Sequence, residues 1–262
     1  MMMIIMMMTI IIVVMKKLEG KISVVTGGSE GIGFASAKRF VLEGAKVVIT
    51  GRRQAELDKA VAELGPNASA VRADASKLAD IDHLIAEVKK LHGRIDVLLV
   101  NAGVARSAPL GEITEEDFDY DYDINVKGTV FTVQKALPLL GEGSAIILLA
   151  STVGISGTAG ASIYSSTKAA IRNLARTWIL DLKDRKIRVN VLSPGATRTP
   201  GLEGLAPAGQ AEGFLAYLAG VIPMGRVGDA DEMGKAAVFL ASDDSSYVNG
   251  AELFANGGLA QI

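Results

Sequence analysis

The chain has 262 residues, of which 49% are hydrophobic and 21% charged, a composition and length typical of one large α/β domain with a substantial core. Its formal net charge of −2 gives no electrostatic reason to expect a nucleic acid or an anionic membrane as partner. The absence of cysteine excludes disulfides and thiolate chemistry, and the presence of only two histidines argues against a histidine-centred triad or metal site. We therefore expect a cytoplasmic, metal-independent protein.

The first fourteen residues, MMMIIMMMTIIIVV, differ in character from the rest of the chain. They are apolar but too short to span a bilayer as a helix, and they lack the basic start and small-residue cleavage site of a secretory signal. We therefore predict that residues 1–14 are an extension outside the fold, and that residues 15–262 form one domain. A membrane-associating or oligomer-contacting segment is the alternative.

Short apolar runs alternate with longer helical patterns after this extension. The runs are rich in Val and Ile and apolar on both faces, as strands of a covered parallel sheet are. The patterns between them place apolar residues three and four apart, which predicts amphipathic helices. Strands are expected at 21–26, 45–50, 68–73, 95–100, 144–150, 187–193 and 251–255, and helices at 35–45, 54–65, 78–93 and 115–140. This order predicts a single α/β domain: a Rossmann-like, doubly wound parallel sheet of about seven strands with helices on both faces.

The stretch TGGSEGIG, residues 26–33, joins the first predicted strand to the first predicted helix. Glycine permits the tight turn that this connection needs, and it lets backbone N–H groups approach a pyrophosphate at a helix N-terminus. The alternative is a glycine-rich turn without a ligand. Its position at the carboxyl end of a predicted parallel sheet favours the phosphate site.

The chain resembles the short-chain dehydrogenase/reductase family from about Lys17 to its C-terminus. The family's motifs occur in order: T-G-x-x-x-G-I-G, Asn101-Ala102-Gly103, Asn125, Ser151, Tyr164-x-x-x-Lys168 and Pro194-Gly195. Each element alone is common, because a serine after a strand is usually a cap and an asparagine in a helix is usually polar filler. Together in this order they are highly specific.

The resemblance implies a nicotinamide dinucleotide cofactor. An acidic residue after the second strand is typical of NAD(H) enzymes of this fold, whereas arginine suits the 2′-phosphate of NADP(H). Here Gly51 stands in that place and Arg52 follows, so we predict NADP(H) rather than NAD(H). Glu30 in the glycine loop is expected to weaken phosphate binding by like-charge repulsion. The residues implied in cofactor binding are Gly27, Ser29, Glu30, Gly31, Ile32, Gly33, Arg52, Arg53, Asp74, Asn101, Gly103, Tyr164, Lys168, Pro194, Gly195, Thr197 and Thr199. Without the resemblance, Asp74 would be taken as a turn or N-cap aspartate.

The resemblance also implies a four-residue reaction centre for interconverting a carbonyl and a secondary alcohol. Tyr164 is the expected general acid/base, and Lys168, one helical turn away, is expected to lower its pKa from about 10. Ser151 is expected to bind the substrate oxygen. Asn125 is expected to position a water in a proton relay.

The substrate is a small carbonyl or alcohol molecule that the sequence does not identify. A 3-oxoacyl thioester on an acyl carrier protein is one alternative, with Arg172 and Arg176 as candidates for a basic docking patch. A non-catalytic nucleotide-binding regulator or scaffold is an alternative of another class. The segment between Pro194 and Asp229 is rich in Gly, Ala, Leu and Pro and is expected to form a mobile, mostly apolar lid over the substrate. Family members are often tetramers, so a homotetramer is also expected.

Overall fold

A computed structural model describes residues 16–261, so the extension predicted at residues 1–14 lies outside the described residues. The described chain contains a seven-stranded parallel sheet with the strand order β3-β2-β1-β4-β5-β6-β9. The strands are β1 (Ile22–Thr26), β2 (Lys46–Gly51), β3 (Ala68–Arg72), β4 (Ile95–Val100), β5 (Leu140–Leu149), β6 (Arg188–Pro194) and β9 (Glu252–Ala255). The predicted doubly wound α/β fold is therefore confirmed.

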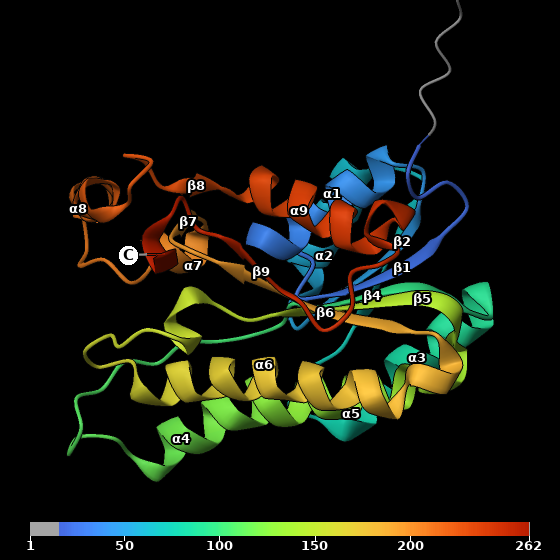
Figure 1. The fold of residues 1–262 in the computed structure, drawn as a ribbon, viewed down its shortest axis with the longest axis horizontal. Helices are drawn as coiled ribbons and strands as arrows, with labels where there is room; N and C mark the ends of the chain where they lie inside the picture. Colours follow the sequence, from blue (N-terminus) through green and yellow to red (C-terminus); the bar gives the residue numbers. More distant parts are fainter. Residues whose placement is uncertain (1–15, 262) are drawn as a thin grey trace, which may run out of the picture.

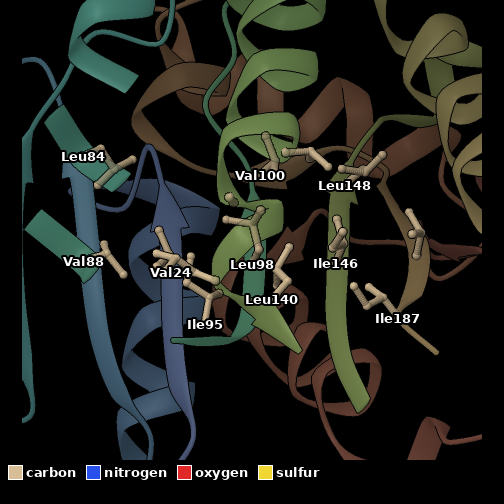
Figure 2. Packing of buried hydrophobic residues seen from close by; sticks show 14 of the residues in the cluster. Val24, Leu84, Val88, Ile95, Leu98, Val100, Leu140, Ile146, Leu148 and Ile187 are labelled. Atoms are coloured by element: carbon tan, nitrogen blue, oxygen red, sulfur yellow. The ribbon is translucent and has the colours of Figure 1, made fainter. Parts of the chain in front are cut away.

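Helices cover both faces of the sheet (Figure 1). The first face carries α1 (Gly31–Leu42), α2 (Gln54–Leu64) and α9 (Ala230–Ala241), and the second carries α3 (Leu78–His92), α5 (Gly128–Ala136) and α6 (Ser162–Asp181). Successive strand residues point to opposite faces. Val24 thus packs with the second layer and Val25 with the first. Figure 2 shows the buried hydrophobic residues on the face covered by α3, α5 and α6, where Leu98 of β4 lies beside Ile146 of β5.

The long helix predicted over 115–140 is confirmed as one continuous helical run, but it is not a regular α-helix throughout. The helix α4 (Glu115–Tyr122) continues into a π-helical turn (Asp123–Lys127), and α5 follows. Asn125 lies in this turn, and its side chain forms hydrogen bonds with the backbone of Val104 in the loop after β4. A π-helical turn often occurs at a functional site.

The strand predicted at 144–150 begins earlier than expected. Its first residue, Leu140, pairs with Ile95, and the register shifts before Val97. The sequence LGEGS at the start of β5 did not indicate a strand, because glycine is uncommon inside strands and, where present, often marks an irregularity of this kind.

The segment predicted as a lid is largely folded and follows the carboxyl end of β6. It contains β7 (Thr197–Arg198), α7 (Pro200–Glu203), α8 (Ala211–Val221) and β8 (Gly228–Asp229), of which β7 and β8 pair in parallel. The two helices lie at one end of the sheet, away from the layer of α3 and α5 (Figure 1). Within residues 16–261, no helix has both the length and the apolar character needed to cross a bilayer.

Candidate active site

The glycine turn between β1 and α1 has a backbone that only glycine fits well. Gly27 and Gly31 have positive φ angles of 63° and 57°. A Cβ atom on Gly33 would lie 2.1 Å from the carbonyl oxygen of Gly27. The start of α1 is thus pressed against the turn, and a side chain at position 33 would force them apart.

Asn101 holds this turn from the neighbouring strand. Its Nδ2 donates to the carbonyl oxygens of Thr26 and Gly27 at 2.9 and 3.0 Å, and its backbone N–H donates to Thr26 Oγ1 at 2.9 Å. The side-chain amide therefore braces the glycine turn against the end of β4, a role that the motif alone did not indicate. Direct contact between Asn101 and a cofactor stays a prediction.

The N-terminus of α1 fits an anion. Its N-cap residue, Glu30, makes no capping hydrogen bond with its side chain, so the carboxylate does not occupy the N–H groups of the first turn. Glu30 Oε1 instead pairs with Arg53 Nη2 at 2.8 Å. An uncapped helix N-terminus beside a glycine turn suits the pyrophosphate of a dinucleotide. The charge of Glu30, expected to oppose phosphate, is balanced by Arg53.

Arg52 lies at the end of β2 and is exposed. Its Nη1 donates to the hydroxyl oxygen of Tyr120 on α4 at 3.2 Å. Ser29 of the glycine turn also lies here, since a Cβ atom on Gly51 would be 3.4 Å from Ser29 Oγ. The structure thus places an arginine and a hydroxyl together at the end of β2, where the predicted cofactor would have its adenosine ribose.

Asp74 follows β3 and forms a turn with its own side chain. Its Oδ1 accepts hydrogen bonds from the backbone N–H and the hydroxyl of Ser76 at 3.0 and 2.8 Å. Its backbone N–H donates to Asp80 Oδ2 at 2.9 Å. These bonds match the turn interpretation of Asp74, and its contact with an adenine stays a prediction.

The segment after β6 packs between β9 and the glycine turn. A Cβ atom on Gly195, which follows Pro194, would lie 2.8 Å from the Cα atom of Asn256. Thr197 Oγ1 donates to the carbonyl oxygen of Gly195 at 3.0 Å. Thr199 caps α7, and its methyl carbon would lie 3.4 Å from a Cβ atom on Gly31. Thr199 and the glycine turn are thus direct neighbours.

Tyr164 and Lys168 lie one turn apart on α6, as predicted, and Ser151 follows β5. Lys168 Nζ is 5.5 Å from the centroid of the Tyr164 ring and donates to the carbonyl oxygen of Leu149 at 3.0 Å. Ser151 Oγ accepts from the backbone N–H of Val153 at 3.4 Å, so this serine is also a helix cap. The ends of β5 and α6 bring these three side chains together.

Asn125 joins this group through the loop after β4. Its Oδ1 accepts from Val104 N–H at 2.9 Å, and its Nδ2 donates to Val104 O at 2.9 Å and Thr167 Oγ1 at 3.0 Å. A Cβ atom on Gly103 would lie 3.3 Å from Asn125 Oδ1 and 3.4 Å from Lys168 Nζ. The absence of a side chain at Gly103 therefore leaves the space that the Asn125 amide and the Lys168 ammonium both approach.

Burial dominates the ionisation of both reaction-centre groups. It raises the pKa of Tyr164, although the adjacent Ser151 hydroxyl acts in the opposite direction. It lowers the pKa of Lys168 from 10.5 to about 8. The expected lowering of the phenol pKa by Lys168 is thus not found in this chain by itself, because desolvation of the phenolate outweighs the stabilising contacts.

Asp121, in the last turn of α4, was missed from the sequence. It lies in the acidic run EEDFDYDYD, residues 115–123, yet its side chain is completely buried. Its Oδ2 accepts from the backbone N–H of Arg106 at 3.3 Å. Its spacing of four residues from Asn125, which puts both on one helix face, was the signal available in the sequence.

The chain is similar in sequence and in fold to known oxidoreductases. Residues 27–260 match the family model described as enoyl-(acyl carrier protein) reductase. The chain is 47% identical over 250 residues to oxidoreductase asL5 of Sarocladium schorii, covering 95% of this chain and 99% of that protein. It is 37% identical over 248 residues to 3-oxoacyl-(acyl-carrier-protein) reductase FabG of Thermotoga maritima, covering 93% and 99%. The crystal structure of a short-chain dehydrogenase/reductase, a glucose/ribitol dehydrogenase from Brucella melitensis, superposes with a TM-score of 0.88 at 31% identity, covering 93% and 98%. The chain therefore belongs to the short-chain dehydrogenase/reductase family and is an oxidoreductase.

Proposed function

We propose that this oxidoreductase uses NADP(H) to interconvert a carbonyl and a secondary alcohol. The observation that carries the proposal is the convergence of Ser151, Tyr164 and Lys168 at the carboxyl end of the sheet, the same end as the uncapped N-terminus of α1. Open α/β sheets bind their ligands at this end. A proton donor and a dinucleotide site on one edge are what carbonyl reduction requires.

The bound nicotinamide supplies the hydride in reduction and accepts it in oxidation. The phenol of Tyr164 donates its proton to the substrate oxygen as negative charge develops there. The hydroxyl of Ser151 donates a hydrogen bond to the same oxygen and stabilises that charge. The ammonium of Lys168 stabilises the resulting phenolate. Asn125 positions a water molecule through which a proton from solvent returns to the phenolate by way of Lys168.

The preference for NADP(H) is proposed from Arg52 and Ser29. Arg52 follows β2, Gly51 stands where NAD(H) enzymes of this fold carry an acidic residue, and Ser29 lies beside Gly51. The guanidinium of Arg52 is suited to the 2′-phosphate. The pairing of Glu30 with Arg53 supports the proposal, because it balances the one charge in the glycine turn that opposes phosphate.

The catalytic proposal is tested with Tyr164→Phe and a panel of ketones, aldehydes and sugars, with NADPH consumption as the readout. We expect the loss of nearly all turnover with cofactor binding unchanged, since general acid catalysis contributes about 10²–10⁴-fold. Tyr247→Phe is the matched control, because Tyr247 is fully exposed. Unchanged turnover in Tyr164→Phe would refute the mechanism.

The cofactor proposal is tested by measuring the reaction rate with NADPH and with NADH at equal coenzyme concentrations. We expect the wild type to favour NADPH, and Arg52→Ala to lose that preference by about 10-fold or more, as expected for a charge-assisted hydrogen bond. Lys59→Ala, which removes an exposed cation on α2, is the control. A wild-type preference for NADH would contradict the proposal.

A second candidate is reduction of a 3-oxoacyl thioester carried by an acyl carrier protein. The similarity to the Thermotoga maritima reductase favours it. The predicted docking patch is only half present, however. Arg172 is largely buried and pairs with Glu252 at 3.0 Å, whereas Arg176 is exposed. Activity on an acyl-carrier-protein thioester that falls in Arg176→Ala would support this candidate.

The non-catalytic alternative makes an opposite prediction. A nucleotide-binding regulator or scaffold would bind NADPH and turn over no member of the panel.

A homotetramer in the cytoplasm is also proposed. The tetramer is proposed from the resemblance of the last residues, YVNGAELFANGGLAQI, to the family's assembly region. The apolar groove between α5 and α6, lined in part by Val130, Leu137 and Trp178, is a suitable contact surface. Light scattering that returns a monomer would contradict the tetramer.

A further inference from the structure

Two charged side chains are buried in the described part of the chain, and they have opposite signs. Asp121 on α4 is 0% exposed, and Lys168 on α6 is 4% exposed. Placing a charged group away from water costs several kcal/mol unless another charge or several hydrogen bonds compensate. The burial of both groups in one layer of the fold therefore calls for a physical explanation.

Neither group forms a salt bridge among the described residues. Lys168 Nζ donates to the carbonyl oxygen of Leu149. Asp121 Oδ2 accepts one long hydrogen bond from the backbone N–H of Arg106, and Asp121 Oδ1 has no partner in the structure. The guanidinium of Arg106 is turned to Asp117, with which it pairs at 2.5 Å. The carboxylate of Asp121 is thus held in place but not neutralised.

The helices that carry the two charges are joined at the same level. The Tyr122 hydroxyl on α4 and the Ser166 hydroxyl on α6 lie 3.0 Å apart. One turn beyond Asp121 on the chain, Asn125 donates to Thr167, the residue immediately before Lys168. Figure 1 shows α4 alongside the first half of α6. The buried carboxylate and the buried ammonium thus belong to two helices, α4 and α6, that are in direct contact.

Asp121 is the one acidic residue that is buried in the described part of the chain, which makes it the candidate counter-charge of Lys168. Burial raises the pKa of Asp121 above its usual value, and Arg106 and Lys168 oppose this effect by favouring the ionised form. Burial lowers the pKa of Lys168, and the charge of Asp121 opposes this effect by raising it. The charge of Asp121 also acts on Tyr164, where it raises the pKa further.

We propose that Asp121 is a positioning residue of the reaction centre, and that its buried carboxylate keeps the Lys168 ammonium charged and so sets the upper pH limit of carbonyl reduction. This inference rests on the proposed function, because it gives Lys168 a role that depends on its charge. It assigns a task to a residue outside the group of Asn125, Ser151, Tyr164 and Lys168.

The sign of the effect follows from the pKa of Lys168. The ammonium is lost as the pH rises through about 8. Removing the charge of Asp121 leaves burial unopposed, so the ammonium is lost at a lower pH. An opposite charge stabilises an ammonium, so we expect the alkaline limb of kcat/KM to move to lower pH when the charge of Asp121 is removed.

Asp121→Asn is the test variant, since it keeps the volume and the oxygen that accepts from Arg106 N–H. Asp119→Asn, the same change at an exposed position on α4, is the matched control. The readout is kcat/KM for reduction against pH, with the melting temperature of each variant. We expect Asp121→Asn to lose activity above neutral pH and to recover it on acidification. A purely structural role would lower activity equally at every pH.

A direct measurement on the cofactor-free protein separates this inference from the proposed function. Lysines labelled with carbon-13 at the ε carbon give an NMR signal that follows each ammonium. One signal is expected to titrate with a midpoint of about 8 and to be absent in Lys168→Met. In Asp121→Asn this midpoint is expected to fall, and in Asp119→Asn it is expected to stay.

The outcomes are distinct. A lowered midpoint and a shifted alkaline limb support the inference. An unchanged midpoint in Asp121→Asn overturns it, even where Tyr164→Phe is inactive and the proposed function stands. Full activity in both Tyr164→Phe and Lys168→Met refutes the proposed function and removes the catalytic meaning of Asp121, whatever the midpoint does.

Discussion

Gly33→Ala is the sharpest test of the proposed dinucleotide site, because the change adds one methyl group at the tightest point of the glycine turn. The new Cβ atom would lie 2.1 Å from the carbonyl oxygen of Gly27 and 2.5 Å from Asn101 Nδ2, whereas ordinary contact begins at 3.4 Å. Relief of the first overlap alone requires the two atoms to separate by about 1.3 Å. The backbone of the turn has to move, since a carbonyl oxygen cannot rotate away as a flexible side chain can.

The magnitude follows from two costs. Overpacking of this kind destabilises a fold by about 1–3 kcal/mol. Displacing the first turn of α1 by an ångström also removes hydrogen bonds to a bound phosphate, each worth about 1.5–3 kcal/mol. The loss of one such bond weakens cofactor binding by about 10- to 100-fold.

The assay is calorimetric titration with NADPH, together with the melting temperature. Gly141→Ala is the matched control, since a Cβ atom on Gly141, at the amino end of β5, has no heavy atom within 4 Å. We expect weaker binding in Gly33→Ala and unchanged binding in Gly141→Ala. Equal affinity in Gly33→Ala and the wild type would show that the N-terminus of α1 does not hold the cofactor, and would refute the reasoning.

Three further predictions concern charge and capping. Glu30→Gln releases Arg53 and removes the negative charge from the glycine turn. The affinity for NADPH, measured by titration, should therefore rise by up to about fivefold, which corresponds to the largest energy typical of an exposed ion pair. Weaker binding would contradict this expectation. The hydrogen bond from Arg39 lowers the pKa of Asp231 from 3.8 to about 2, so the carboxylate stabilises the fold above 3.8 and loses this effect as the pH falls toward 2. The difference in melting temperature between the wild type and Asp231→Asn should therefore vanish in that interval; a constant difference would point to another cause. Thr114→Ala removes the N-cap of α4 and should lower the free energy of unfolding, measured in urea, by about 1 kcal/mol.

The layers of the fold were predictable because each strand and most helices carry their own periodic pattern. Tyr164 and Lys168 were predictable for the same reason, since a spacing of four on one helix fixes their side chains on one face. The π-helical turn at Asn125 was not predictable from the spacing of apolar residues. It depends on hydrogen bonds between this residue and Val104 in a distant loop.

Contacts between separate loops were also beyond the sequence. The pairing of Glu30 with Arg53 joins the turn after β1 to the turn after β2, so Glu30 looked like an obstacle to phosphate when it was considered alone. Asp121 was hidden by its neighbours, since the run EEDFDYDYD is typical of a solvated acidic helix. Burial depends on what packs over a residue, and here α6 does.

The electrostatics of the reaction centre favour one direction of the proposed reaction. Reduction needs a protonated Tyr164 beside a charged Lys168, and oxidation needs the phenolate. Burial raises the pKa of the phenol, which preserves the form needed for reduction near neutral pH. An alkaline medium that would produce the phenolate also removes the ammonium that stabilises it, because Lys168 titrates at about 8. On the proposed roles, the chain is therefore better suited to protonating a substrate oxygen than to deprotonating an alcohol, and Asp121 strengthens this bias by opposing the phenolate while it retains the ammonium.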